Sequence, residues 1–149
     1  MDSPPHIRIA RPDELELALE VERCAFGSDE EAELVRLLLD DPSAQPSLDL
    51  LAFDGERAVG HLLFTAARLE GADSSPRCSL LAPLAVVPSD QGRGVGGALI
   101  RDGLEAPFPI PAKDADAWMV QALDGASPAR WRGAIVPADV FMRPEYWRE

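Results

Sequence analysis

Residues 80–105 of this 149-residue chain have the sequence LLAPLAVVPSDQGRGVGGALIRDGLE, and this stretch decides the fold. The apolar run Leu80 to Val87 predicts a buried strand, and Pro88-Ser89-Asp90 predicts a turn. A glycine-rich loop follows, and a helix is expected from about Gly94. The glycines leave backbone N–H groups unshielded at the positive end of the helix dipole. Such a helix start is suited to a phosphate or pyrophosphate, to which Arg93 can add a charged donor.

Two other interpretations of the glycine-rich loop stay open. One is an ordinary tight turn before a helix, although a turn alone requires one glycine. The other is a dinucleotide-binding fingerprint, because the loop satisfies the pattern G-x-G-x-x-G. That fingerprint opens a strand–helix–strand unit near the start of a parallel sheet, whereas several strand-like runs precede this loop. The glycines concerned are Gly92, Gly94, Gly96 and Gly97.

A strand and a helix are predicted near the N-terminus. His6 to Ala10 alternates like a strand, and Asp13 with Glu16 has the spacing of a helix capping box. The helix is expected to end at Gly27, since glycine often closes a helix. Its apolar stripe is expected to consist of Leu17, Val21, Cys24 and Ala25.

A second helix and two further strands are predicted next. Ser28 with Glu31 has the spacing of another capping box, and Asp41-Pro42 stops the helix. Two strand-like runs meet at Asp54-Gly55, which is a strong signal for a hairpin. The predicted ranges are Leu48 to Phe53 and Arg57 to Thr65 for these strands and Gly71 to Pro76 for the following turn, with Leu34, Leu37 and Leu38 as the helix stripe. The order is therefore strand, helix, helix, three strands and helix, an α/β (α+β) arrangement in a single domain over 1–149.

Composition restricts the partners. The chain has 14 Lys and Arg against 26 Asp and Glu, a net charge of −12, which argues against nucleic acid as the main partner. Cys24 and Cys78 lack metal or redox spacing and are expected to be free thiols in a reducing compartment. No signal peptide and no apolar run long enough for a membrane span is found in the sequence. We therefore expect a soluble, cytoplasmic protein without metal or membrane partner.

The loop and the strand before it resemble a known family. Gln91 to Gly96 matches the Q/R-x-x-G-x-G/A signature of the GNAT acetyltransferases, and Leu84 to Pro88 resembles the strand that precedes it in that family. The resemblance implies the acyl-CoA N-acyltransferase fold, a mixed and mainly antiparallel sheet flanked by helices. Segments that resemble the YhbS-like branch of the family are Ala25 to Gly27, Glu30 to Val35, Val59 to Phe64, Ala106 to Pro111, Ala117 to Leu123 and Arg132 to Val136.

This resemblance implies an N-acetyltransferase that moves the acetyl group of acetyl-CoA, its co-substrate, to an amine of unknown identity. In the family the strand backbone holds the pantetheine arm, and the loop N–H groups hold the pyrophosphate. Pro83 supports this assignment independently, because a proline within a strand implies a bulge or a break in pairing that frees backbone groups for a ligand. The cofactor-binding residues implied by the resemblance are Leu84, Ala85, Val86, Gln91, Gly92, Arg93, Gly94, Val95 and Gly96.

The C-terminal half departs from the family pattern. Leu104-Glu105 continues directly into Ala106-Pro107, where the resemblance implies a fifth strand and another helix. The central strand is left with a hydrophobic edge that invites pairing. Trp118 to Leu123 or Gly133 to Val136 can fill that place, a second chain can cover it in a homodimer, or the chain is only marginally stable. The alternative function is a catalytically impaired CoA-binding or dimerising interaction module derived from a GNAT enzyme.

Catalytic residues stay unknown at this point. The candidates for a general base each have a structural interpretation as well. Asp29 and Glu30 suit a helix N-terminus, Glu22 a solvated helix face, and His61 a satisfied position in the sheet. In the family a tyrosine of the absent helix often serves as general acid, and that role is not transferred to Tyr146, the single tyrosine of the chain.

Overall fold

The computed structural model describes residues 3–70, 78–105 and 135–147. Its helices and strands follow the predicted order as far as residue 105. The predicted turn Gly71 to Pro76 and the segment Trp118 to Leu123 lie outside the described residues. The elements are β1 His6–Ile9, α1 Leu15–Phe26, α2 Glu30–Asp40, β2 Leu48–Asp54, β3 Arg57–Leu69, β4 Cys78–Val86, α3 Val95–Glu105 and β5 Ile135–Val136.

The strands form one antiparallel sheet. β1, β2, β3 and β4 lie side by side in that order, and each neighbouring pair is antiparallel. The hairpin predicted at Asp54-Gly55 is confirmed, and Gly55 has the left-handed φ of 60° that this turn requires. The two residues of β5 pair with Arg68 and Leu69 at the far end of β3. Within the described part of the chain, β4 is therefore an edge strand.

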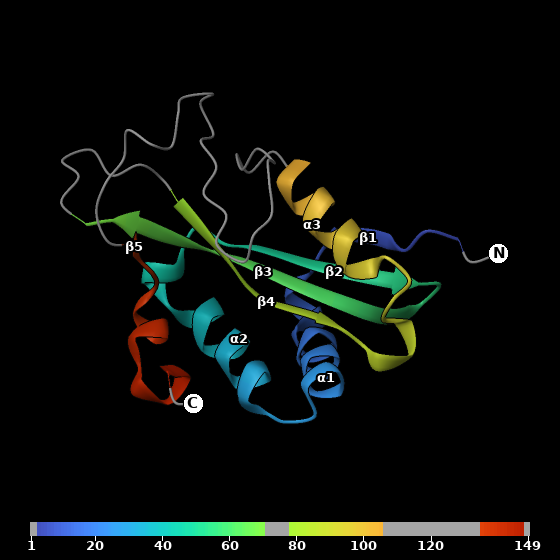
Figure 1. Ribbon diagram of the computed structural model, residues 1–149, viewed down its shortest axis with the longest axis horizontal. Helices are drawn as coiled ribbons and strands as arrows, with labels where there is room; N and C mark the ends of the chain where they lie inside the picture. Colours follow the sequence, from blue (N-terminus) through green and yellow to red (C-terminus); the bar gives the residue numbers. More distant parts are fainter. Residues whose placement is uncertain (1–2, 71–77, 106–134, 148–149) are drawn as a thin grey trace.

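Helices cover both faces of this sheet. α3 lies on one face, and α1 and α2 lie on the other (Figure 1). Glycine allows α3 to approach closely, because a Cβ atom at Gly60 would lie 2.8 Å from Leu99 Cδ1 and 2.9 Å from Val95 Cγ1. A Cβ atom at Gly103 of α3 would lie 2.5 Å from Phe64 Cε2. These two glycines fix how closely α3 packs on the sheet.

The start of α1 differs from the prediction. The capping box of Asp13 with Glu16 is wrong, because Glu14 supplies the carboxylate instead. Glu14 accepts hydrogen bonds from the Arg11 backbone N–H at 2.9 Å and from the Arg8 guanidinium at 2.6 and 2.7 Å. The Arg8 bonds, followed by the Arg11 backbone bond, lower the pKa of Glu14 to about 2. The observed box joins Arg11 and Glu14, so the sequence placed it two residues too late, because Asp is a commoner N-cap residue than Arg.

The buried face of α1 also differs from the predicted stripe. Val21 is buried as expected, whereas Leu17 is 44% exposed and Cys24 is exposed. The helix ends at Gly27 with a φ of 72°, as predicted. The residues of α1 that are buried are Ala18, Leu19, Val21 and Glu22. The helix is therefore rotated relative to the predicted stripe, and a carboxylate lies on its inner face.

α2 agrees with the predicted stripe but not with the predicted cap. Leu34 and Leu38 are buried, and the helix stops before Asp41-Pro42. Ser28 donates a hydrogen bond to Glu31 Oε2 at 3.2 Å, but the N-cap residue is Asp29, whose side chain does not cap the helix. The predicted capping box is therefore wrong, because Ser28 bonds the Glu31 side chain and is not the N-cap residue.

Neither cysteine forms a disulfide, and no helix among the described residues is long and apolar enough to cross a bilayer.

Candidate functional site

The glycine-rich loop exposes the start of α3. Gly92 and Gly94 have φ values of 75° and 82°, a conformation that other residues rarely adopt. The first hydrogen bond within the helix joins the Ala98 N–H to the Gly94 carbonyl at 3.0 Å. The N–H groups of residues 95–97 precede that bond and so lack partners within the helix. Together with the helix dipole, they form a site suited to a phosphate.

Asp90 anchors this loop to the sheet. Its side chain is buried and accepts hydrogen bonds from Arg57 at 2.9 and 3.2 Å, from Ser89 at 2.6 Å and from Arg93 at 2.7 Å. The Arg57 bonds contribute most to holding the pKa of Asp90 below its usual range. Arg93, predicted to donate to an anion, therefore uses part of its guanidinium to hold the loop. From the sequence, Asp90 is expected only as part of a turn, although its place just before the glycines could have indicated an anchor.

The bulge predicted at Pro83 is present. Leu81 lies opposite Phe64 and Leu84 lies opposite Leu62, so two residues of β4, Ala82 and Pro83, face one residue of β3. The strand remains paired with β3 on both sides of the bulge. The prediction that Pro83 interrupts regular pairing is thus confirmed, and the interruption is a single extra residue.

The backbone of Leu84 and Val86 faces the open edge of β4. The Val87 N–H donates to the Val59 carbonyl of the β3 segment at 3.0 Å, and alternate residues of a strand direct their backbone groups to opposite edges. Consistent with this direction, the Val86 carbonyl accepts a hydrogen bond from Gln91 Nε2 at 2.9 Å. Both backbone groups of Leu84 and the N–H of Val86 remain directed to the edge, where no described strand pairs with them.

Gly133 to Val136 is one of the segments expected to fill the place beside β4. For Ile135 and Val136, the two residues of that segment that the structure describes, this expectation is wrong. Ile135 and Val136 pair with β3 instead, at a distance along the sheet from Leu84 and Val86.

The open edge of β4 and the start of α3 lie next to each other. A Cβ atom at Gly96 would be 3.7 Å from Val86 Cγ2 and 3.8 Å from Leu84 Cδ2. Helix N–H groups and strand backbone groups can therefore contact one elongated ligand.

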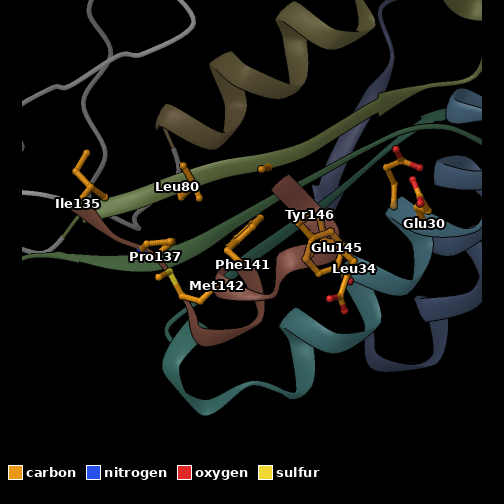
Figure 2. Close-up of a pocket in the computed structure, with 11 residues that line it drawn as sticks. Glu30, Leu34, Leu80, Ile135, Pro137, Phe141, Met142, Glu145 and Tyr146 are labelled. Carbon is orange, nitrogen blue, oxygen red and sulfur yellow. The ribbon is translucent and has the colours of Figure 1, made fainter. Parts of the chain in front are cut away.

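A hollow of about 570 Å³ is lined by residues of α2, of β4 and of the C-terminal segment 135–146. Figure 2 shows the side chains of these three parts of the chain around it. Leu34, Leu80 and Phe141 contribute apolar surface, and Glu30 and Glu145 stand at its border. Asp41 and Ser43 hold the C-terminal segment in place, because Asp41 Oδ2 accepts from the Val140 N–H at 3.1 Å and Ser43 Oγ accepts from the Asp139 N–H at 2.8 Å.

The candidate bases lie in different places. His61 and Glu22 are buried and bond each other through Nδ1 and Oε1, and His61 Nε2 lies 2.9 Å from Asp49 Oδ1. The interpretation of His61 as a satisfied sheet position is confirmed, whereas the solvated face proposed for Glu22 is wrong. Asp29 is exposed and pairs with Arg23 at 3.0 Å. Glu30 lines the hollow.

Tyr146 also lines the hollow, where it packs against the apolar cluster of α2. Burial and, after it, the charge of Glu145 raise the pKa of the Tyr146 phenol, so it is protonated at neutral pH. The sequence did not place Tyr146 near Glu30, since more than a hundred residues separate them.

Known proteins resemble this chain in sequence and structure. No protein-family profile matches it. A Brucella melitensis GNAT acetyltransferase, crystallised with acetyl-CoA, is 33% identical with a TM-score of 0.61, over 68% of this chain and 66% of its own. Escherichia coli YhbS, a GNAT N-acetyltransferase crystallised with CoA, is 30% identical with a TM-score of 0.62, over 69% of this chain and 56% of its own. YjhQ of E. coli K12, an uncharacterized N-acetyltransferase, is 42% identical over 154 residues, which cover 80% of this chain and 84% of YjhQ.

The chain belongs to the GNAT family of acetyltransferases. The fold implied by the GNAT resemblance, an antiparallel sheet flanked by helices, is therefore confirmed. The alignment with YjhQ is longer than this GNAT chain and yet covers only four fifths of it. YjhQ thus has residues within the aligned region that this GNAT chain lacks. The chain also spans less than two thirds of the lengths of the two crystallised GNAT proteins.

Proposed function

We propose that this GNAT protein binds acetyl-CoA and transfers the acetyl group to an amine. The observation that carries the proposal is the contact between the start of α3 and the open edge of β4. The pyrophosphate would lie at the N–H groups of residues 92–97, and the pantetheine arm would follow Leu84 to Val86. The related structures that contain acetyl-CoA or CoA support this choice of ligand. A phosphate group needs the first element, and an extended amide-containing arm needs the second.

Acetyl transfer joins the acceptor nitrogen to the acetyl carbon and exchanges protons with solvent or with side chains of the protein. The lone pair of a neutral amine attacks the thioester carbonyl carbon, the C–S bond breaks, and the thiolate takes up a proton. The Val86 N–H, directed to the open edge, is positioned to donate to the carbonyl oxygen as negative charge develops there. The amine nitrogen loses one proton to solvent or to a carboxylate before the product amide forms.

The first test is a pair of substitutions at Gly97. A Cβ atom at Gly97 would meet no atom within 4 Å, so a side chain fits without disturbing the loop. In Gly97→Glu, a carboxylate enters the first turn of α3, which suits the helix dipole but repels a pyrophosphate. We expect Gly97→Glu to weaken acetyl-CoA binding about tenfold, a loss of about 1.4 kcal/mol, in calorimetric titration.

Gly97→Gln is the matched control, since its side chain has the same size and no charge. It should bind acetyl-CoA more tightly than Gly97→Glu. Equal binding by the two variants would show that the ligand's phosphates lie elsewhere. Failure of the folded wild-type protein to bind acetyl-CoA would overturn the proposed function.

A second candidate function is a cofactor-binding module that no longer catalyses and that dimerises. The observation that favours it is the open edge of β4, which no described strand covers. A second copy could add its own strand there. Turnover of acetyl-CoA with a panel of amines, together with the molar mass from light scattering, separates the two candidates. Binding without turnover in a dimer would favour the module.

A further inference from the structure

We propose that the amine acceptor is a cation with an apolar body and that it binds in the hollow between α2, β4 and the C-terminal segment. This inference rests on the proposed acetyl transfer. The hollow, about 570 Å³ in volume, is large enough for a small organic molecule. Its surface combines apolar side chains with carboxylates, and each of these two features restricts the chemistry of the ligand.

The apolar surface comes from all three parts of the chain. Leu34 of α2 and Phe141 of the C-terminal segment form part of the core cluster, and Leu80 of β4 packs against it. Met142 and Ile135, which also line the hollow, are 61% and 44% exposed. Covering this surface with the hydrocarbon part of a ligand removes apolar area from water, which favours binding.

The carboxylates at the hollow differ from their neighbours on the outside of the helices. Asp29 forms an ion pair with Arg23 at 3.0 Å, and Glu33 forms one with Arg36 at 3.8 Å. Among the described residues, no basic side chain forms an ion pair with Glu30 or Glu145 at the hollow. Glu30 also favours the helix N-terminus, but Glu145 lies outside any α-helix and has no such role. Unpaired carboxylates beside an apolar surface favour a cation and oppose an anion.

The hollow reaches β4 next to the proposed cofactor path. Ala82 lines the hollow, and only Pro83 separates it in the chain from Leu84, where the open edge begins. An amine bound in the part of the hollow next to Ala82 would therefore lie close to a thioester on that edge, and its ammonium form loses one proton to solvent or to a carboxylate before the lone pair attacks. After transfer the nitrogen is part of a neutral amide, so the product loses its attraction to Glu30 and Glu145. That loss of charge favours product release.

The test compares three acceptors that differ in one feature each. Phenethylamine has an apolar body and a cationic amine, ethanolamine has the amine without the apolar body, and phenylalanine adds a carboxylate. We expect kcat/KM to be highest for phenethylamine and lowest for phenylalanine. Glu145→Gln should raise KM for phenethylamine about two- to fivefold, the size expected for an exposed charge pair, without changing acetyl-CoA binding. Met142→Gln should reduce the preference for phenethylamine over ethanolamine.

Glu20→Gln is the matched control, because Glu20 is an exposed carboxylate on α1 that pairs with Arg23 and does not line the hollow. It should leave KM unchanged. Amine binding is also measured without acetyl-CoA, from NMR shifts of the protein with phenethylamine. If acetyl-CoA is not turned over but phenethylamine binds and Glu145→Gln weakens this binding, the hollow is a site for apolar cations and the proposed transfer fails. A preference for phenylalanine, or an unchanged response in Glu145→Gln, would overturn the inference and leave acetyl-CoA binding unaffected.

Discussion

Glu22 and His61 form a buried charged contact between α1 and β3. Both side chains are 0% exposed, and Asp49 on β2 faces the second ring nitrogen of His61. Burial alone lowers the pKa of His61, but the hydrogen bonds and charges of Asp49 and Glu22 together outweigh it and raise the pKa to about 9. His61 is therefore an imidazolium at neutral pH. A charge that is buried with partners on both sides holds α1 in one position on the sheet.

This contact makes the stability of the fold depend on pH. A histidine whose pKa is raised in the folded state contributes stability that is fully present below its unfolded pKa of about 6.5. That stability is lost as the pH rises through about 9, where the folded imidazolium deprotonates. We expect the free energy of unfolding in urea to fall between pH 6.5 and pH 9.5. Glu22→Gln should lower stability at pH 6 and move the fall toward lower pH.

Glu20→Gln, an exposed position on the same helix, is the control and should keep the wild-type pH profile. An identical profile in Glu22→Gln would mean that Glu22 does not stabilise the imidazolium.

Glu22 and Asp90 show which residues the sequence could not place. A charged residue is assigned to the surface by default, because Asp and Glu are rarely buried without a partner. Glu22 is buried against His61, which lies 39 residues further along the chain, and Asp90 is buried against Arg57, which precedes it by 33 residues. Neither partner is visible from local spacing. The Gly92 and Gly94 turns, in contrast, followed from local residue type alone.

At the scale of elements, the packing of α3 depends on two glycines that meet the sheet. Gly103 lies over Phe64, and Gly60 lies under Leu99. Glycine within a helix costs up to about 1 kcal/mol relative to alanine, so Gly103 is retained against its own helix propensity. The close approach of α3 to the sheet also sets where the start of the helix lies relative to the edge of β4.

Alanine substitutions in α3 separate helix propensity from packing. Gly103→Ala puts a methyl group 2.5 Å from the Phe64 ring, and we expect a net loss of about 1–3 kcal/mol in the free energy of unfolding. Gly97→Ala places the same group in open space in the same helix, and it should gain up to about 1 kcal/mol. Urea unfolding of both variants measures the difference. Equal stabilisation by the two would show that α3 does not pack closely at Gly103.

Most elements were predictable because local signals define them. The Asp54-Gly55 hairpin, the Gly27 helix end and the Pro83 bulge each follow from a residue whose backbone preferences are narrow. The pairing of β5 was not predictable, since the two residues Ile135 and Val136 have no periodicity and find Arg68 and Leu69 across a long stretch of chain. The hollow was missed for the same reason, because its walls come from segments distant in sequence.

At the scale of the whole molecule, net charge opposes the proposed ligand. The chain carries −12, and acetyl-CoA is itself an anion. Long-range repulsion slows the encounter, whereas the attraction of the loop N–H groups acts only at short range. Binding must therefore rely on local donors at the start of α3, and the general field of the protein works against the approach.

Salt separates these two contributions. We expect the association rate constant of acetyl-CoA to rise between 10 and 150 mM NaCl, because the Debye length shortens from about 30 to about 8 Å and screens the repulsion. Stopped-flow binding measures it. Uncharged pantetheine should associate at a rate that does not change with salt. A rate constant that falls for acetyl-CoA would mean that a local positive field, from Arg57 and Arg93, dominates the approach.

The extra residue in β4 also determines where the strand can change length. Leu81 and Leu84 both face α3 although they are three residues apart, because Ala82 and Pro83 together occupy one position opposite β3. Deleting one of these two residues would restore even pairing and leave every other side chain of β4 on its present face. Deleting a residue elsewhere in the strand would turn half of it over, with its core side chains toward the wrong layer. Natural length variation in this strand is therefore expected to be confined to this pair.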